Sequence, residues 1–250
     1  GSLAWSLRFR CMNCHTEGTP QNNKFVKDHG EKVAWVKKGG AEATMTYLLE
    51  SKLLDLDQPE KSLLLQKPLG LVKHEGGIKF APGDQAYKGF RQWIEDVAAV
   101  KKDTFTKADQ LPPKDVRPLA FGTEAWFKIT NTPNAWSGKL LQVDIYAWDE
   151  RTKAWELEPC ASADRMVGAK GNIWQHTVTL FATQGSTRAK AWQQGKPALP
   201  SGKYLLKVYV DADGRLQKDW QAKLGEKDYV GQVEFRGEWK EGYGSMTVAD

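Results

Sequence analysis

Residues 11–15, CMNCH, place two cysteines and a histidine within one short stretch near the start of the chain. A covalent haem site needs two thiols that add to the two vinyl groups on one porphyrin edge, and a histidine that reaches the iron. Cys11, Cys14 and His15 have this order and spacing. The motif therefore predicts one covalently bound haem c, with Cys11 and Cys14 as thioethers and His15 as the proximal iron ligand.

Two other chemistries use a pair of cysteines at this spacing. A structural zinc needs four ligands, usually from two such pairs, and the sequence has no second pair and only three further histidines. A thioredoxin-like dithiol follows a strand of a parallel sheet, whereas the surrounding pattern here is helical. Haem is therefore favoured over both. The third cysteine, Cys160, has no nearby partner and is expected to be a buried thiol.

The first hundred residues have the apolar spacing of helices. A short amphipathic helix is expected just before the cysteines, and a final helix carries aromatic and aliphatic residues on one face. Glycine-rich loops separate the helices. The pattern predicts an all-α domain over residues 3–102, with helices at residues 3–9, 41–54, 57–67 and 82–100.

A longer resemblance accompanies the motif. The run PEKSLLLQKPLGLVKHEGGIKFAPGDQAYKGFRQWIED, residues 59–96, is similar to the planctomycete-type cytochrome c domain in its leucine cluster, its histidine followed by glycines, its Pro-Gly turn and its final helix with Trp-Ile. Glu75, between the histidine and the glycines, departs from the more usual pattern. The resemblance covers residues of about 3–100 and implies a class I-like cytochrome c fold that carries one electron.

The second axial position of the iron decides the chemistry of such a site. The loop in which class I cytochromes place a methionine has none here, and it holds His74 beside Gly76, which lets the backbone approach closely. We expect His74 to be the distal ligand. Three alternatives stay open: His74 instead binds a haem propionate or caps the final helix, Met45 is the ligand, or Lys73 or an open site takes the position.

A change of period marks the second half of the chain. Residues 103–115 are polar and proline-containing, as is typical of a linker. Beyond them apolar and polar residues alternate, with turn-rich segments and no strong helix between. We expect an all-β antiparallel sandwich, immunoglobulin-like, over residues 116–250, with strands at 125–131, 140–149, 174–182, 203–213 and 229–239. Most of its tryptophans should lie in the core.

Composition limits the partners. The net charge is only +5, and no basic run with interleaved aromatics suggests nucleic acid. No apolar window is long enough for a transmembrane span. Lysines follow the haem motif closely, and two interpretations stay open: they steer an acidic redox partner, or they belong to a solvated loop. They are Lys24, Lys27, Lys32, Lys37 and Lys38.

These observations predict a c-type cytochrome that carries one electron, rather than an enzyme, with a β-domain that docks it to a partner, a surface or a glycan. Because haem c is attached outside the bacterial cytoplasm, the interpretation implies the periplasm or the cell surface. Two other functions stay open. One is a haem-based gas or redox sensor, or a peroxidase-like protein, with a labile distal ligand. The other is a glycan- or protein-binding β-module with an ancillary haem domain.

Overall fold

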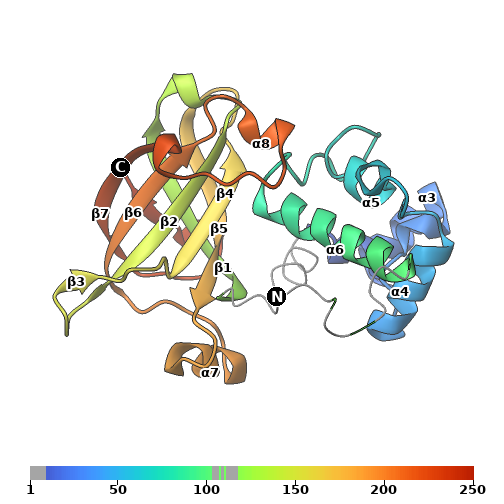
Figure 1. Cartoon of the computed structure of the whole chain (residues 1–250), viewed down its shortest axis with the longest axis horizontal. Coiled ribbons are helices and arrows are strands. Elements are labelled where there is room, and N and C mark those ends of the chain that lie inside the picture. Colours follow the sequence, from blue (N-terminus) through green and yellow to red (C-terminus); the bar gives the residue numbers. More distant parts are fainter. Residues whose placement is uncertain (1–9, 103–106, 108–109, 111–117) are drawn as a thin grey trace. The chain divides into compact units, whose positions relative to one another are not determined.

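The computed structural model describes residues 10–102, 107, 110 and 118–250, and these divide into two compact units (Figure 1). The first unit takes in the residues up to Phe80 and again those from Ala86 to the end of the last helix before the break. The second takes in residues 81–85 and all those after the break. The helix expected at residues 3–9 lies outside the described residues, as does the expected linker 103–115 apart from Lys107 and Gln110.

Short helices make up most of the first unit. Helices α4 and α6 confirm two predictions, and the helix expected at 57–67 is divided in two by a bend. Helix α3 was not predicted; it begins where the Thr19 hydroxyl accepts a hydrogen bond from Asn22 and Pro20 opens the first turn. The elements are α2 (Met12–His15), α3 (Pro20–His29), η1 (Glu31–Val33), α4 (Gly40–Glu50), η2 (Pro59–Lys61), α5 (Leu63–Gln66) and α6 (Gln85–Lys101).

Helix α6 contributes a buried apolar face to the core of this unit. Tyr87, Phe90 and Ile94 recur at three- and four-residue intervals and are all buried. The Phe90 ring lies 5.0 Å, centroid to centroid, from that of Phe80. The loop that precedes α6 is therefore anchored to the helix by aromatic packing.

A single eight-stranded sheet forms the second unit, in the order β7-β6-β2-β4-β5-β1-β8, with β3 paired to β2. Neighbouring strands are antiparallel except for β1 and β8, which are parallel. The sheet curls into a near-barrel (Figure 1). Its strands are β1 (Leu119–Thr132), β2 (Leu140–Asp149), β3 (Ala154–Trp155), β4 (Ala161–Met166), β5 (Asn172–Ala182), β6 (Gly202–Val210), β7 (Tyr229–Gly237) and β8 (Thr247–Ala249).

The expected fold class, an all-α class I-like domain followed by an antiparallel immunoglobulin-like sandwich, is wrong. A sandwich has two separate sheets, whereas β4 here pairs with both β2 and β5 and joins all the strands into one sheet. A register shift in β1 between Gly122 and Trp126 bends this long strand. The alternating pattern predicts strands with one buried face, and a curled sheet buries that face as a sandwich does.

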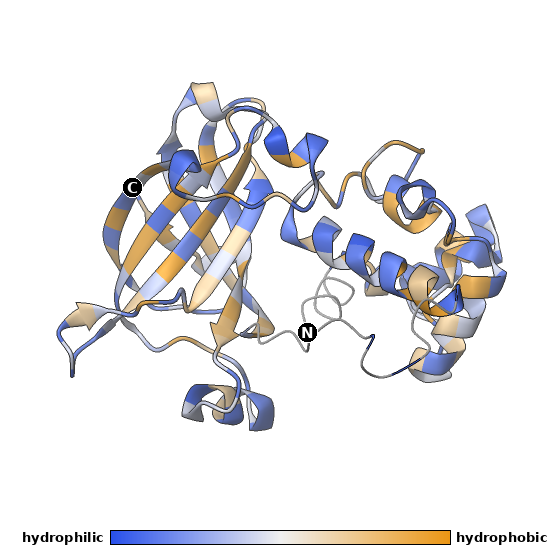
Figure 2. Cartoon of the chain, viewed as in Figure 1, coloured by the Kyte–Doolittle hydropathy of each residue, from blue (hydrophilic) through white to orange (hydrophobic). Residues whose placement is uncertain are grey.

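Aromatic side chains fill the interior of the sheet. Phe127 is fully buried, and its ring lies 5.2 Å from Phe235 and 6.1 Å from Trp239. Tyr204 packs edge-on against Trp239 at 5.2 Å. Figure 2 shows the matching alternation of hydrophobic and hydrophilic residues along β2 and β6. The interior of the second unit is thus filled by its own side chains.

Helices also occur between the strands, contrary to the prediction. Helix α7 (Thr187–Gln194) begins where the Ser186 hydroxyl accepts a hydrogen bond from Ala189, and it buries Trp192. The other short elements are α8 (Arg215–Lys218), η4 (Asn134–Trp136), η5 (Glu226–Asp228) and η6 (Tyr243–Ser245). Within the described ranges, no helix combines the length and apolar character that crossing a bilayer requires.

Candidate functional site

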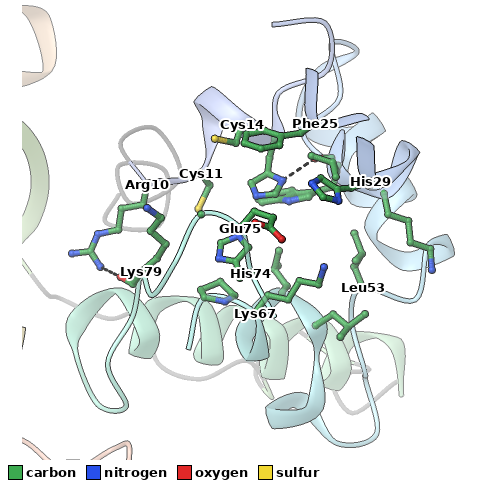
Figure 3. A pocket seen from close by; sticks show the side chains of 18 of the residues that line it. Arg10, Cys11, Cys14, Phe25, His29, Leu53, Lys67, His74, Glu75 and Lys79 are labelled. Atoms are coloured by element: carbon green, nitrogen blue, oxygen red, sulfur yellow. Dashed lines mark hydrogen bonds between the residues drawn. The ribbon is translucent and has the colours of Figure 1, made fainter. Parts of the chain in front are cut away.

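The first unit contains a partly open cavity of about 460 Å³, within the range of about 300–1,000 Å³ that is usual for ligand and cofactor sites. Cys11, Cys14, His15 and His74 all line it. Figure 3 shows Cys11, Cys14 and His74 around this one space, although His74 is far from the cysteines in the sequence. Lys73, the least favoured candidate for the distal position, lines it too, so five of the six residues proposed from the sequence as thioether or iron ligands are brought together.

His15 is held at the end of α2 by its own ring. Its Nδ1 lies 2.8 Å from the carbonyl oxygen of Val33, and because a carbonyl only accepts, Nδ1 carries the proton. This leaves Nε2 as the nitrogen available to a metal. Burial lowers the pKa of His15; the hydrogen bond to Val33 opposes this shift, whereas His74 and Lys67 act in the same direction as burial. The neutral imidazole, which is the form that ligates, is thus favoured.

His74 is oriented in the same way by a tight turn. Its Nδ1 donates to the Gly77 carbonyl oxygen at 2.8 Å, and the Gly77 amide donates back to the His74 carbonyl at 2.9 Å. Gly77 has a φ of +68°. A Cβ on Gly76 would lie only 3.0 Å from His74 Cε1, so glycine at this position gives the ring room. The turn again leaves Nε2 as the possible metal ligand.

The two imidazoles lie near each other with nearly parallel planes. Their ring centroids are 6.1 Å apart, and their planes differ by 11°. A metal ion about 2 Å from one nitrogen of each of two opposed imidazoles holds the ring centroids about 6 Å apart. His15 and His74 therefore have the separation of two ligands on opposite sides of one metal ion.

The two cysteines of the motif are not joined in a disulfide, and they lie at either end of the first helical turn. The His15 amide donates to the Cys11 carbonyl at 3.0 Å, which places the histidine directly after the turn. Burial raises the pKa of the Cys11 thiol to about 11, so this sulfur is protonated at neutral pH. The Asn22 side chain donates Nδ2 to the Cys14 carbonyl at 2.8 Å and ties the turn to α3.

Positive charge dominates the described lining of the cavity. Glu75 is the only acidic residue among these lining residues, and it forms an ion pair with Lys73 at 2.9 Å. Such a lining suits a ligand with anionic groups, and haem has two propionates. The basic side chains are Arg10, Lys32, Lys67, Lys73 and Lys79.

The remaining sequence candidates occupy other places. Met45 is half-buried on α4 and is not among the described residues that line the cavity. His29, the last residue of α3, is exposed and lines the cavity. The Val33 carbonyl and the ring of Trp35 were missed. A backbone carbonyl leaves no signal in the sequence, and a lone tryptophan in a helix-rich region predicts only core packing.

The second unit has its own candidate residues. Cys160 is buried as predicted, with 1% of its surface exposed, and burial raises the pKa of its thiol to about 12. Trp148 and Trp155, in contrast, are half-buried and meet edge-on at 5.0 Å. The Lys203 ammonium lies 4.8 Å and 5.0 Å from their ring centroids. The two tryptophans form a partly exposed aromatic pair on the β2–β3 hairpin.

No protein-family model, curated protein or solved structure matches the chain. Across the described residues there is also no group of three or more histidine, cysteine, aspartate or glutamate side chains placed to hold a metal ion.

Proposed function

We propose that the chain is a c-type cytochrome that carries one electron on a single covalently attached haem. The observation that carries the proposal is the pair of opposed imidazoles, His15 and His74, whose centroids are 6.1 Å apart in a cavity also lined by Cys11 and Cys14. Two thiols can hold this cofactor covalently, and two imidazole nitrogens can ligate its iron. When bound, the haem supplies an iron that alternates between the ferric and ferrous states.

The chain's own residues hold and tune that group. Cys11 and Cys14 would hold the haem as thioethers, each thiol adding its sulfur to one carbon of a vinyl group and its hydrogen to the other. The Val33 and Gly77 carbonyls fix the tautomers of His15 and His74, so that each presents Nε2. Two imidazoles in place of an imidazole and a thioether predict a reduction potential below that of a histidine–methionine site.

The proposed redox partner of the cytochrome is an acidic protein. Lys24, Lys27, Lys32 and Lys38 are exposed, and Lys32 lines the cavity where a partner would approach. Lys37 contributes less, because it forms an ion pair with Glu17 at 3.4 Å. Exposed charges of one sign speed the approach of an oppositely charged protein, and salt screens the effect. Haem c attachment places the proposed cytochrome in the periplasm or at the cell surface.

An optical spectrum tests the proposal directly. The purified chain, produced with the haem-attachment machinery, should keep its haem after denaturation and give a low-spin six-coordinate spectrum in both oxidation states. His74→Ala should keep the covalent haem but lose the six-coordinate spectrum and bind carbon monoxide when reduced. A chain without covalent haem would overturn the proposal.

Carbon monoxide separates the electron carrier from the sensor or peroxidase-like alternative. His74 lies in an exposed loop, and this is the observation that favours a displaceable ligand. An electron carrier should show a ferrous spectrum that carbon monoxide does not change. Rapid displacement of His74 in the unmodified chain would favour the alternative instead.

For the second unit we propose a docking role that positions the cytochrome against a partner, a surface or a glycan. The half-exposed Trp148–Trp155 pair supports this, because aromatic side chains at partly exposed positions are enriched at interfaces. The full-length chain with Trp148→Ala and Trp155→Ala should lose binding to a glycan array or a candidate surface. The haem spectrum should stay unchanged, and equal binding by parent and variant would contradict this role.

A further inference from the structure

One short segment holds His15 on both its backbone and its ring. The Val36 amide donates to the His15 carbonyl at 3.0 Å, and the Glu17 amide donates to the Val36 carbonyl at 2.9 Å. These bonds form a small parallel bridge between Thr16 and Val36. Because the Val33 carbonyl from the same segment accepts from Nδ1, the position of the imidazole is set by residues 33–36.

Trp35, within this segment, contacts the imidazole itself. Only 5% of its surface is exposed, and its ring centroid lies 5.3 Å from that of His15, with the planes tilted by 33°. A hydrogen bond to Nδ1 fixes that atom but restrains rotation of the ring only weakly. A buried indole against the ring restrains that rotation by steric contact, because packed aromatic side chains have little free space.

Among the ring contacts of the described residues, none places an indole against His74. The ring of His74 meets that of His15 instead. The Gly77 carbonyl fixes its Nδ1, and the close approach of Gly76 limits its ring on one side. The two independent restraints leave the imidazole planes only 11° apart. The near-parallel arrangement is therefore built from both sides of the cavity.

We propose that Trp35 is a positioning residue that keeps the His15 imidazole nearly parallel to that of His74, and so sets the electronic structure of the iron site. This inference rests on the proposed function. When two axial imidazoles are parallel, their π orbitals interact with the same iron d orbital and separate it in energy from its neighbour. Perpendicular imidazoles interact with one orbital each and leave the pair nearly degenerate.

Electron paramagnetic resonance of the ferric protein distinguishes these arrangements. Parallel imidazoles predict a rhombic low-spin spectrum with three resolved g-values. A low-spin spectrum dominated by one very large g-value would overturn the inference and leave the bis-histidine proposal standing. A high-spin spectrum, or a chain without haem, would overturn both.

Variants of Trp35 test which residue sets the angle. Trp35→Leu should shift and broaden the g-values while the optical spectrum stays six-coordinate, and Trp35→Phe should restore most of the parent spectrum. Trp93→Leu removes a half-buried indole from α6, outside the cavity lining, and should leave the g-values unchanged. A Trp35→Leu spectrum identical to the parent's, or an equal shift in Trp93→Leu, would overturn the role of Trp35. The spectrum of the unmodified protein tests the parallel arrangement even if Trp35→Leu does not fold.

Discussion

The interiors of the two units differ in what fills them. The second unit is packed by its own side chains, with Phe127, Tyr204, Phe235 and Trp239 in mutual contact. The first unit surrounds a cavity of about 460 Å³ lined by thiols, imidazoles and basic side chains. The interior of the second unit is thus filled by its own side chains. The first unit has a cavity whose size and lining groups would suit a cofactor.

This difference implies that the two units owe their stability to different terms. A filled core is stabilised by burial and close packing, which depend on the chain alone. A cavity whose lining combines apolar side chains with thiols, imidazoles and basic groups gains stability when a ligand binds the folded state and not the unfolded one. Variants that affect one unit and leave the other unchanged would establish the contrast.

The largest expected effect comes from removing both thiols. Cys11→Ala with Cys14→Ala should abolish covalent haem attachment, because no other described cysteine lines the cavity. The unfolding transition of the first unit should move to lower temperature as the bound group is lost. Haem staining after denaturing electrophoresis and calorimetry measure the two effects. A covalent haem that survives the double substitution would contradict the site.

The next effect should be confined to the second unit. Phe127→Ala removes a fully buried ring from the aromatic cluster and should cost about 3–5 kcal/mol in the free energy of unfolding of that unit. Phe127→Leu, which keeps most of the volume, should cost less. Denaturant titration followed by near-ultraviolet circular dichroism measures the loss. The haem spectrum should not change, and a matching loss of haem would show that the units do not behave separately.

A smaller effect is expected in the first unit at Asn22, a polar residue with only 1% of its surface exposed. It donates to the Cys14 carbonyl and accepts from the Gly18 amide at 3.3 Å. Asn22→Ala leaves these buried groups without their partner and should cost about 1–3 kcal/mol. The exposed neighbour Asn23 is the matched control, since Asn23→Ala should stay within about 0.5 kcal/mol of the parent. Equal losses in the two variants, measured by thermal unfolding, would contradict a specific role for Asn22.

The smallest effect depends on pH and concerns Asp144 on β2. Burial raises the pKa of this carboxyl, although the Gln142 side chain donates to it at 3.0 Å. Because the folded-state pKa lies above the unfolded value of about 4, ionisation is disfavoured only in the folded state. The free energy of unfolding therefore falls as the pH rises through this window. Asp144→Asn removes the cost of burying a charged carboxylate. The variant should be more stable than the parent at pH values above this window, with no gain in stability below it.

Asp149, at the end of the same strand, provides a control of opposite sign. The Arg151 amide donates to it at 2.8 Å, and this hydrogen bond lowers the pKa of the Asp149 carboxyl. A lowered pKa contributes stability that is present above the unfolded value and is lost as the pH falls. Asp149→Asn should therefore be slightly less stable than the parent at neutral pH. Urea titrations across the acidic range measure both variants, and the same sign for both would contradict the assignment.

Local patterns in the sequence predicted individual elements well. The helix over 82–100 appears as Gln85–Lys101, and the strand over 140–149 appears as Leu140–Asp149, because each has an apolar face of the correct period. Helix α3 was missed, since its polar sequence PQNNKFVKDH shows little apolar periodicity and its capping residues carry the signal. Strand β4 was missed as well. Its sequence, ASADRM, lacks large apolar residues, and its small side chains are buried between two neighbouring strands.

The sequence by itself determined the chemistry available to this chain, because Cys11, Cys14 and His15 are close neighbours along the chain in the order that covalent haem attachment uses. It also brought His74 forward as a candidate, through its glycines and the lack of a methionine in its loop. Only the tertiary structure decided that His74 lies opposite His15, that Val33 and Trp35 hold the first ring, and that the strands join in one sheet. These relations join residues that are distant in the chain or act through the backbone, and packing rather than local pattern selects them.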